Sequence, residues 1–169
     1  MTDEPHQSSL EDLLARLRFA LTEPIDFRNT DLATTQAKVR LLTAAATYFN
    51  LLALTDFGGR VGPAREAGLV EQVVAAAFQT YGGYDPHPGP FAKAAMLLRG
   101  ITQGHPFHDA NKRTGFLTAA YSLELMGIPL PEDFATGEME ALALRVSAGE
   151  LRDVDAIALE LRRLWEGTT

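Results

Sequence analysis

The chain has 169 residues, of which 46% are hydrophobic and 22% charged, a composition typical of one soluble globular domain with a real core. It contains no cysteine, which excludes disulfides, thiolate nucleophiles and cysteine-ligated zinc and suits a reducing cytoplasm. The formal net charge of −7 argues against nucleic acid or an anionic membrane as the main partner, and no apolar run has membrane-spanning length.

The N-terminal third of the chain predicts one short helix and one long one. The segment from Met1 to Ser9 lacks the apolar region of a secretory signal. A stripe of leucines then predicts a helix from Leu10 to Leu21, with a capping box that begins at Ser8 or Ser9. Apolar residues at helical spacing from Asp31 to about Leu54 predict one long helix or two joined helices.

The middle of the chain predicts a loop and two further helices. Three glycines and a proline within Asp56–Pro63 break the helical pattern and indicate a loop or a short hairpin. Apolar residues at three- and four-residue steps predict a helix from Leu69 to Tyr81, ended by Gly82-Gly83. The proline-rich run Asp85–Pro90 is a rigid connector, and the next helix is expected from Phe91 to Ile101.

The C-terminal part predicts three more helices. The segment from Phe116 to Met126 is apolar almost all round, so we expect it to be the buried centre of the fold. Two helices follow, over Phe134–Val146 and Val154–Trp165. Because no alternating strand pattern and no internal repeat is present, the chain is predicted to be all-α, with about seven helices around one buried helix.

One stretch of eleven residues, His105–Gly115, carries more chemistry than any other segment. It reads His-Pro-Phe-His-Asp-Ala-Asn-Lys-Arg-Thr-Gly and follows the end of one helical pattern. A second helix is predicted to begin near Asp109 or Asn111. The start of a helix attracts anions because its first N–H groups lack partners and its dipole is positive there. Lys112 and Arg113 add full positive charges at this point.

Besides an anion-binding site, three interpretations of this stretch can be compared. A P-loop is excluded because a helix, not a strand, precedes it and Asn111 replaces the glycine that should precede Lys112. A metal-dependent phosphohydrolase of the HD type would use His108-Asp109, but the sequence assigns no further ligand. A purely structural role makes Asp109 an N-cap and the cations solvated surface. Two cations in a first helical turn oppose the dipole, which favours a bound anion instead.

The pattern His105-x-Phe107-x-Asp109-Ala110-Asn111-Lys112-Arg113 resembles the signature of the Fic/Doc family, His-x-Phe-x-(Asp/Glu)-(Gly/Ala)-Asn-(Gly/Lys)-Arg, at every specified position. Gly58-Gly59 with the following helix resembles the family's flap, and residues 135–165 resemble the C-terminal part of Doc toxins. The resemblance therefore covers about residues 56–165. It implies a Fic/Doc-like catalytic core over residues 56–169, a hairpin flap near 57–64 and an N-terminal helical extension over residues 1–55 that packs on the core.

The resemblance also implies a role for each motif residue. His105 would be the general base toward a Ser, Thr or Tyr hydroxyl of a target protein, because imidazole exchanges protons near neutral pH. Asp109 would hold Mg²⁺ against the phosphates of ATP. Phe107 would be an apolar anchor, and Gly58-Gly59 would dock the target. The phosphates would be bound by Asn111, Lys112, Arg113 and Thr114.

Two positions favour one branch of the family. Family members that transfer AMP usually have glycine in place of Lys112 and a second arginine in place of Phe116. The lysine version is similar to Doc toxins, which phosphorylate a translation elongation factor with ATP. We therefore expect a cytoplasmic toxin enzyme that transfers phosphate from Mg-ATP to a protein hydroxyl, with elongation factor Tu as a candidate target. AMP transfer and a catalytically idle module that binds an antitoxin stay open as alternatives.

The resemblance makes a further statement about regulation. Self-inhibited family members carry a helix with Ser/Thr-x-x-x-Glu-Gly/Asn, and the nearest window, which includes Glu166, begins with arginine. An inhibitor is therefore expected to act in trans, as an antitoxin that folds along an apolar groove. The Leu10–Leu21 helix is open to two interpretations, a packing helix or a lid. Also open is whether Tyr81, Tyr84 or His87 faces the nucleotide.

Overall fold

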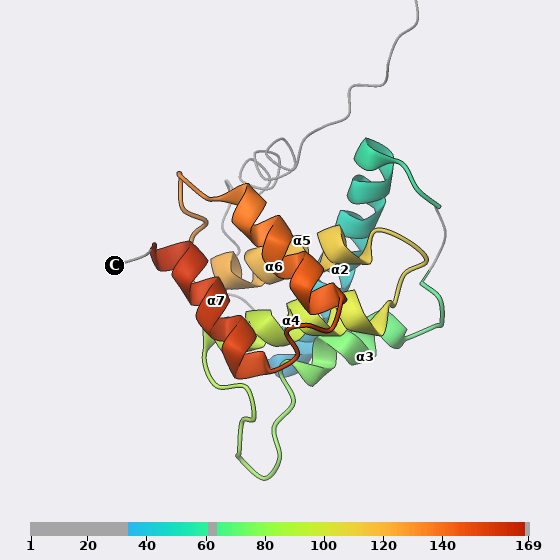
Figure 1. The fold of residues 1–169 in the computed structure, drawn as a ribbon. Coiled ribbons are helices and arrows are strands. Elements are labelled where there is room, and N and C mark those ends of the chain that lie inside the picture. The colour runs from blue at the N-terminus through green and yellow to red at the C-terminus, as the bar shows by residue number, and fades with distance from the viewer. Residues whose placement is uncertain (1–33, 61–63, 168–169) are drawn as a thin grey trace, which may run out of the picture.

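The computed structural model describes residues 34–60 and 64–167, and these ranges form an all-helical bundle (Figure 1). The predicted all-α class is confirmed. The expected helix from Leu10 to Leu21 and its capping box lie outside the described residues. No helix in the described ranges is long and apolar enough to cross a membrane. The helices are α2 (Thr35–Phe57), α3 (Leu69–Ala76), α4 (Pro90–Gly104), α5 (Asn111–Leu125), α6 (Thr136–Ser147) and α7 (Val154–Glu166).

Helix α5 is the enclosed centre of the bundle, as its sequence predicted. Every residue from Thr114 to Leu123 is buried, and α5 packs against α2, α4 and α6. Figure 1 shows it crossing the middle of the molecule behind α6. The hydroxyls of Thr118 and Ser122 donate hydrogen bonds of 2.7 Å to carbonyl oxygens of the same helix. These bonds let small polar side chains occupy the core without an unpaired donor.

Gly115 of α5 lies close against α4. A Cβ atom at this position would lie 2.9 Å from Cγ2 of Thr102 and 3.2 Å from the carbonyl oxygen of Leu98. The second contact is with backbone, which cannot rotate away. Glycine is therefore needed here for space, and the close crossing fixes where α5 begins relative to the end of α4.

Helix α2 is a single helix of 23 residues, and its C-terminal end lies further along the chain than the end predicted at about Leu54. Thr34 caps its start by accepting a hydrogen bond of 3.2 Å from the backbone N–H of Ala37. The helix continues through Phe57 and ends at Gly58, with φ 73° and ψ 171°. The loop or hairpin expected near residues 57–64 therefore begins later, at 58. Residues 58–60 are irregular, and residues 61–63 lie outside the described part of the chain.

Helix α3 is shorter than predicted, because the apolar pattern continues beyond its last helical residue. After Ala76, Ala77 and Phe78 stay buried in a tight turn. Tyr81, the expected last helical residue, instead pairs with Tyr84 through two backbone hydrogen bonds of 2.9 and 3.0 Å. The two side chains are 60% and 68% exposed. Their loop projects at the bottom of Figure 1.

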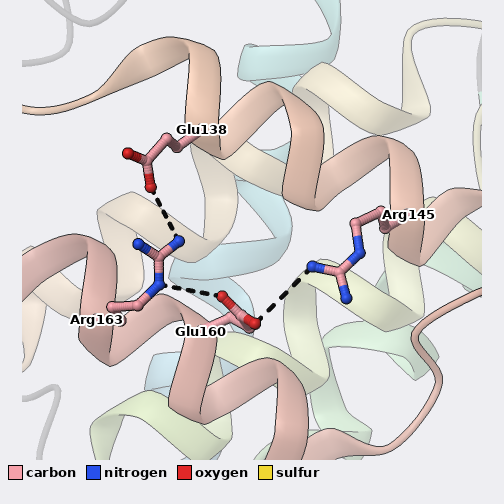
Figure 2. Close-up of polar contacts among 4 residues, drawn as sticks. All are labelled: Glu138, Arg145, Glu160 and Arg163. Atoms are coloured by element: carbon pink, nitrogen blue, oxygen red, sulfur yellow. Dashed lines mark hydrogen bonds and ion pairs between the residues drawn. The ribbon is translucent and has the colours of Figure 1, made fainter. Parts of the chain in front are cut away.

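Helices α6 and α7 are joined by a row of ion pairs, drawn in Figure 2. Arg163 contacts Glu138 at 2.9 Å and Glu160 at 3.3 Å, and Glu160 also lies 3.8 Å from Arg145. The hydrogen bond that Arg163 donates to Glu138, followed by the one that it donates to Glu160, raises the pKa of Arg163. Glu138, Arg145 and Arg163 are exposed and Glu160 is half-buried, so the row links the two helices and adds little stability.

An aromatic row runs from α5 through Phe134 to α7. The rings of Phe116 and Phe134 are stacked with centroids 6.2 Å apart, and Phe134 meets Trp165 edge-on at 4.7 Å. Phe116 is 2% exposed and Trp165 is 7% exposed. The row connects the first turns of α5 with the C-terminal end of the fold.

Candidate active site

The loop between α4 and α5 is bounded by two residues with a left-handed backbone. His105 has φ 45° and ψ 54°, and Ala110 has φ 59° and ψ 20°. They are the only non-glycine residues with positive φ in the described ranges. Such residues are strained unless their surroundings hold them, and they concentrate at functional sites. The backbone at Ala110 explains physically why glycine or alanine, with the smallest side chains, suits this position.

Asn111 closes the loop through its side chain. Its Oδ1 accepts a hydrogen bond of 3.0 Å from the N–H of Phe107, and its Nδ2 donates one of 3.0 Å to the carbonyl of the same residue. Phe107 is 3% exposed and packs with Ala46, Val70 and Ile101. The arrangement fits the expected anchoring role of Phe107. The amide of Asn111, expected at the phosphates, is 7% exposed and is committed to holding the loop.

Asn50 of α2 is a residue of the site that the sequence analysis missed. Its Nδ2 donates to the carbonyl oxygen of Asp109 at 2.8 Å and to Oγ1 of Thr114 at 3.1 Å. The available signal was a polar residue four positions after Ala46 on the apolar face of α2. Thr114 is fully buried, so its side chain faces Asn50 in the interior. The expected contact between this hydroxyl and phosphate has no support in this geometry.

Asp109 presents its carboxylate at the surface beside the segment that follows α2. Oδ1 accepts from the N–H of Ala110 at 2.7 Å, and Oδ2 accepts from the N–H of Arg60 at 3.3 Å. These two bonds, with smaller contributions from the charges of Arg113 and Lys112, lower the pKa of Asp109. The N-cap of α5 is Ala110, and no side chain caps this helix, so the structural interpretation of Asp109 as N-cap was wrong.

Gly59 allows the segment after α2 to approach Asp109. With φ 137°, a Cβ at this position would lie 2.8 Å from Oδ2 of Asp109 and 2.7 Å from Cδ2 of Leu54. A larger residue would be strained in this backbone conformation and would have to move the Asp109 carboxylate or the end of Leu54. Arg65 makes a second contact between the α2–α3 and α4–α5 connections, since its N–H donates to the carbonyl of Pro106 at 2.8 Å. In Figure 1 the α2–α3 and α4–α5 connections lie together at the right.

The first turn of α5 carries two exposed cations and no acidic residue. Lys112 and Arg113 lie there, whereas α7 begins with Asp153 as a side-chain cap and Asp155 in its first turn. The charge at the start of α5 therefore opposes the dipole and suits a bound anion. A pocket of about 270 Å³ opens beside the cations. Its lining residues are Lys112, Arg113, Phe116, Met139, Glu140, Ala143 and Leu144.

The donor set fits a magnesium ion that is bound together with nucleotide phosphates. Within the described residues no three His, Cys, Asp or Glu side chains form a group able to hold a metal. The HD-type interpretation of His108-Asp109 thus gains no further ligand from this part of the chain. One ionised carboxylate at Asp109 matches the way Mg²⁺ usually binds, through one or two carboxylates, water and substrate phosphates.

The remaining candidates are distributed between the site and the opposite loop. His105 and His108 are both exposed on the α4–α5 connection. Tyr81 and Tyr84 lie on the α3–α4 loop, which Figure 1 shows well away from that connection. His87 belongs to the same loop, where its N–H donates to Asp85 at 2.9 Å. These three residues are therefore not part of the group around Asp109.

Comparison with known proteins shows which family the chain resembles. The sequence model of the Fic/DOC family matches residues 39–123. The chain is 36% identical to Toxin Doc of Mycolicibacterium smegmatis over 105 residues, which are 62% of this chain and 79% of the relative. It is 31% identical to the protein named Protein kinase doc of Escherichia phage P1 over 123 residues, covering 68% and 90%. A Fido domain-containing protein of Dictyostelium discoideum is 37% identical over 65 residues, covering 37% and 46%.

The matched region begins inside α2, whereas the motifs had connected only residues 56–165 with the family. Helix α2, which supplies Asn50, thus lies in the matched region, although the sequence analysis assigned it to an N-terminal extension. The whole signature from His105 to Arg113 lies on the loop and first turn that α2 supports. The chain belongs to the Fic/DOC family and is similar to its Doc toxins.

Proposed function

We propose that this protein is a Doc-like toxin that transfers the γ-phosphoryl group of Mg-ATP to a hydroxyl of a target protein. The observation that carries the proposal is the α4–α5 connection, which exposes a histidine, an ionised carboxylate and two cations on one braced loop beside a pocket. The names of the relatives, a toxin and a protein kinase, support the same reaction. We propose that the protein acts in the cytoplasm, because a Doc-like toxin would meet its target protein there.

In the proposed reaction, His105 accepts the proton of the target hydroxyl. The hydroxyl oxygen forms a bond to the γ-phosphorus while the bond from that phosphorus to the bridging oxygen breaks, and ADP leaves with the electron pair. Lys112 and Arg113 balance the charge of the phosphate oxygens. Asn111 acts indirectly, by holding the loop that carries these groups.

Asp109 is the proposed contact to the magnesium ion. Mg²⁺ would neutralise phosphate charge when it is bound with ATP. The lowered pKa of Asp109 supports this role, because the carboxylate is ionised throughout the physiological pH range. Gly58 and Gly59 belong to the segment beside this carboxylate, and we propose that the target protein docks along it.

Phosphoryl transfer is favoured over AMP transfer by Phe116. Its side chain is buried and stacked on Phe134. A second arginine at this position would put a charged side chain where this ring packs in the core. The first turns of α5 therefore offer phosphate the cations Lys112 and Arg113 without a second arginine at position 116, which supports a different placement of the nucleotide from that in AMP-transferring relatives.

The proposed partners follow from the same assignment. The target is a protein with an accessible hydroxyl, and elongation factor Tu is the first candidate to test. An antitoxin acting in trans is the proposed inhibitor, because the sequence contains no match to the self-inhibitory helix.

Mass spectrometry of intact elongation factor Tu after incubation with Mg-ATP tests the reaction. We expect a phosphate-sized addition with the wild-type protein and none with His105→Ala. His108→Ala is the matched control, since it removes a neighbouring exposed histidine that has no role in the proposal. An AMP-sized addition would support the alternative transfer, and an addition that persists in His105→Ala would refute the assigned base.

A further inference from the structure

Asn50 is the contact through which α2 holds the main chain of the motif. It is 4% exposed, and its amide nitrogen reaches the carbonyl oxygen of Asp109 at 2.8 Å and Oγ1 of Thr114 at 3.1 Å. A carbonyl oxygen can only accept, so the amide must present its N–H₂ group to the loop. Both hydrogens of that group therefore have acceptors, one on the connection into α5 and one in the first turn of that helix.

The carbonyl that Asn50 binds belongs to the peptide that joins Asp109 to Ala110. Its orientation matters because Ala110 has a left-handed backbone, which a rotated peptide would not maintain. The N–H of that peptide donates to the Asp109 carboxylate at 2.7 Å. The C=O of this peptide is thus held by Asn50, and its N–H by the Asp109 carboxylate. The amide of Asn50 therefore sets the direction in which the Asp109 side chain points.

We propose that Asn50 is a positioning residue for the Mg-nucleotide site: it holds the Asp109 peptide so that the carboxylate faces the ion bound with the phosphates. The inference rests on the proposed function, since it assigns Asp109 to the ion. Helix α2 and the segment after it then contact Asp109 at two points. Asn50 binds the carbonyl, and the N–H of Arg60 binds Oδ2 of the carboxylate.

Asparagine suits this position better than other side chains of its size. Leucine has the same bulk but leaves the carbonyl of Asp109 without the donor that Asn50 supplies. Aspartate would place an acceptor against that carbonyl. Serine is too short to reach it. Loss of a side chain that orients a metal ligand typically lowers metal affinity by about 10- to 100-fold.

The test compares the affinity for ATP with and without Mg²⁺ by calorimetry in the full-length protein. In wild type, Mg²⁺ should tighten ATP binding. In Asn50→Leu and in the milder Asn50→Ser, that gain should fall about tenfold or more. ATP affinity without Mg²⁺ should stay within about twofold, because Lys112 and Arg113 are unchanged.

Two control variants separate positioning from stability. Ile157→Val removes a buried methyl group from α7, so it destabilises the fold without touching the motif. Thr43→Val lies on α2 and removes a buried hydroxyl for which the described residues offer no hydrogen-bond partner. Both controls should keep the full gain from Mg²⁺.

Hydrogen exchange provides a readout that needs no ligand. In Asn50→Leu and Asn50→Ser, the backbone amides of Ala110 and Phe107 should exchange at least about tenfold faster than in wild type, while amides of α7 keep their rates. An unchanged gain from Mg²⁺ in both Asn50 variants would overturn the inference, as would equal loss of ATP affinity with and without Mg²⁺. If wild type itself gains nothing from Mg²⁺, the proposed function fails instead.

Discussion

At the scale of single residues, Ala110 is the position where backbone conformation and side chain conflict. A left-handed backbone costs a residue with a Cβ about 1–2 kcal/mol, and a β-branched side chain adds to that cost. We expect Ala110→Gly to leave the free energy of unfolding within about 1 kcal/mol of wild type, because relief of strain is offset by the entropy of glycine. Ala110→Val should lower it by about 2 kcal/mol.

Urea unfolding followed by circular dichroism measures this difference. The control is Ala141→Val on the exposed surface of α6, where the change should be less than about 1 kcal/mol. Equal effects of valine at the two positions would mean that the loop does not hold Ala110 in its left-handed state.

Asn111 allows a graded series at one position, since it both accepts from and donates to the backbone of Phe107. Asn111→Leu removes both bonds and leaves two buried groups unpaired, so we expect it to lower the free energy of unfolding by about 2 kcal/mol or more. Asn111→Asp keeps the acceptor and should fall between leucine and wild type. Denaturant midpoints rank the three proteins. A wild-type midpoint for Asn111→Leu would contradict the role of Asn111 in closing the loop.

At the scale of elements, the α3–α4 loop is held by Lys93 of α4. Its Nζ lies 2.6 Å from Oδ2 of Asp85 and 2.9 Å from the carbonyl of His87, and it also approaches the ring of Phe78 at 5.6 Å. The hydrogen bond from Lys93, and then that from the N–H of His87, lower the pKa of Asp85. The contribution of Asp85 to stability is therefore complete above about pH 4 and is lost as pH falls through the lowered pKa.

Asp85→Asn tests this dependence on pH. At pH 7 the variant should be less stable than wild type by about 1 kcal/mol or less, because the pair is only partly buried. The difference should shrink as pH falls through the lowered pKa of Asp85, because the wild-type carboxyl then also becomes protonated. Thermal unfolding at pH 7, 4 and 2 provides the measurement, and a difference that grows toward low pH would contradict the assignment.

The ends of two helices show which boundaries the sequence predicts correctly and which it does not. The predicted start of α7 near Val154 is confirmed, because Asp153 accepts from the N–H of Ala156 at 2.9 Å and makes a local cap. The predicted end of α3 was wrong, since Ala77 and Phe78 keep the helical apolar pattern although they are packed from a turn. Local capping chemistry can be read in one segment, whereas packing depends on the facing helices.

At the scale of the whole molecule, Gly115 tests how much of the stability depends on the α4–α5 crossing. Gly115→Ala should lower the free energy of unfolding by about 1–3 kcal/mol, because the new methyl group meets Thr102 and a backbone carbonyl. The matched control is Gly137→Ala in α6, where a Cβ meets nothing within 4 Å. There the better helix propensity of alanine should raise stability by about 0.5 kcal/mol.

Both substitutions can be compared by urea unfolding, with fluorescence and circular dichroism as separate probes. Coincident shifts of the two probes in Gly115→Ala would indicate that the crossing supports the entire bundle. A destabilised Gly137→Ala protein or a neutral Gly115→Ala protein would contradict the packing argument.

The helical class, the buried central helix and the signature could be predicted because each is encoded in a continuous segment. Asn50 could not, since its importance arises only when α2 packs beside a loop about 60 residues later in the chain. The same limit applies to Thr114, whose hydroxyl resembles a phosphate ligand in the motif but is buried by α2. Contacts between distant segments decide which polar residues of a motif face the solvent.

The aromatic row also has a spectroscopic consequence. Trp165 is the only tryptophan of the chain, and it is packed against Phe134, which is stacked on Phe116 at the wall of the pocket beside the cations. Its emission should be blue-shifted and poorly quenched by iodide. A ligand in the pocket would lie beside Phe116, so the emission of Trp165 provides an optical test of the proposed nucleotide binding.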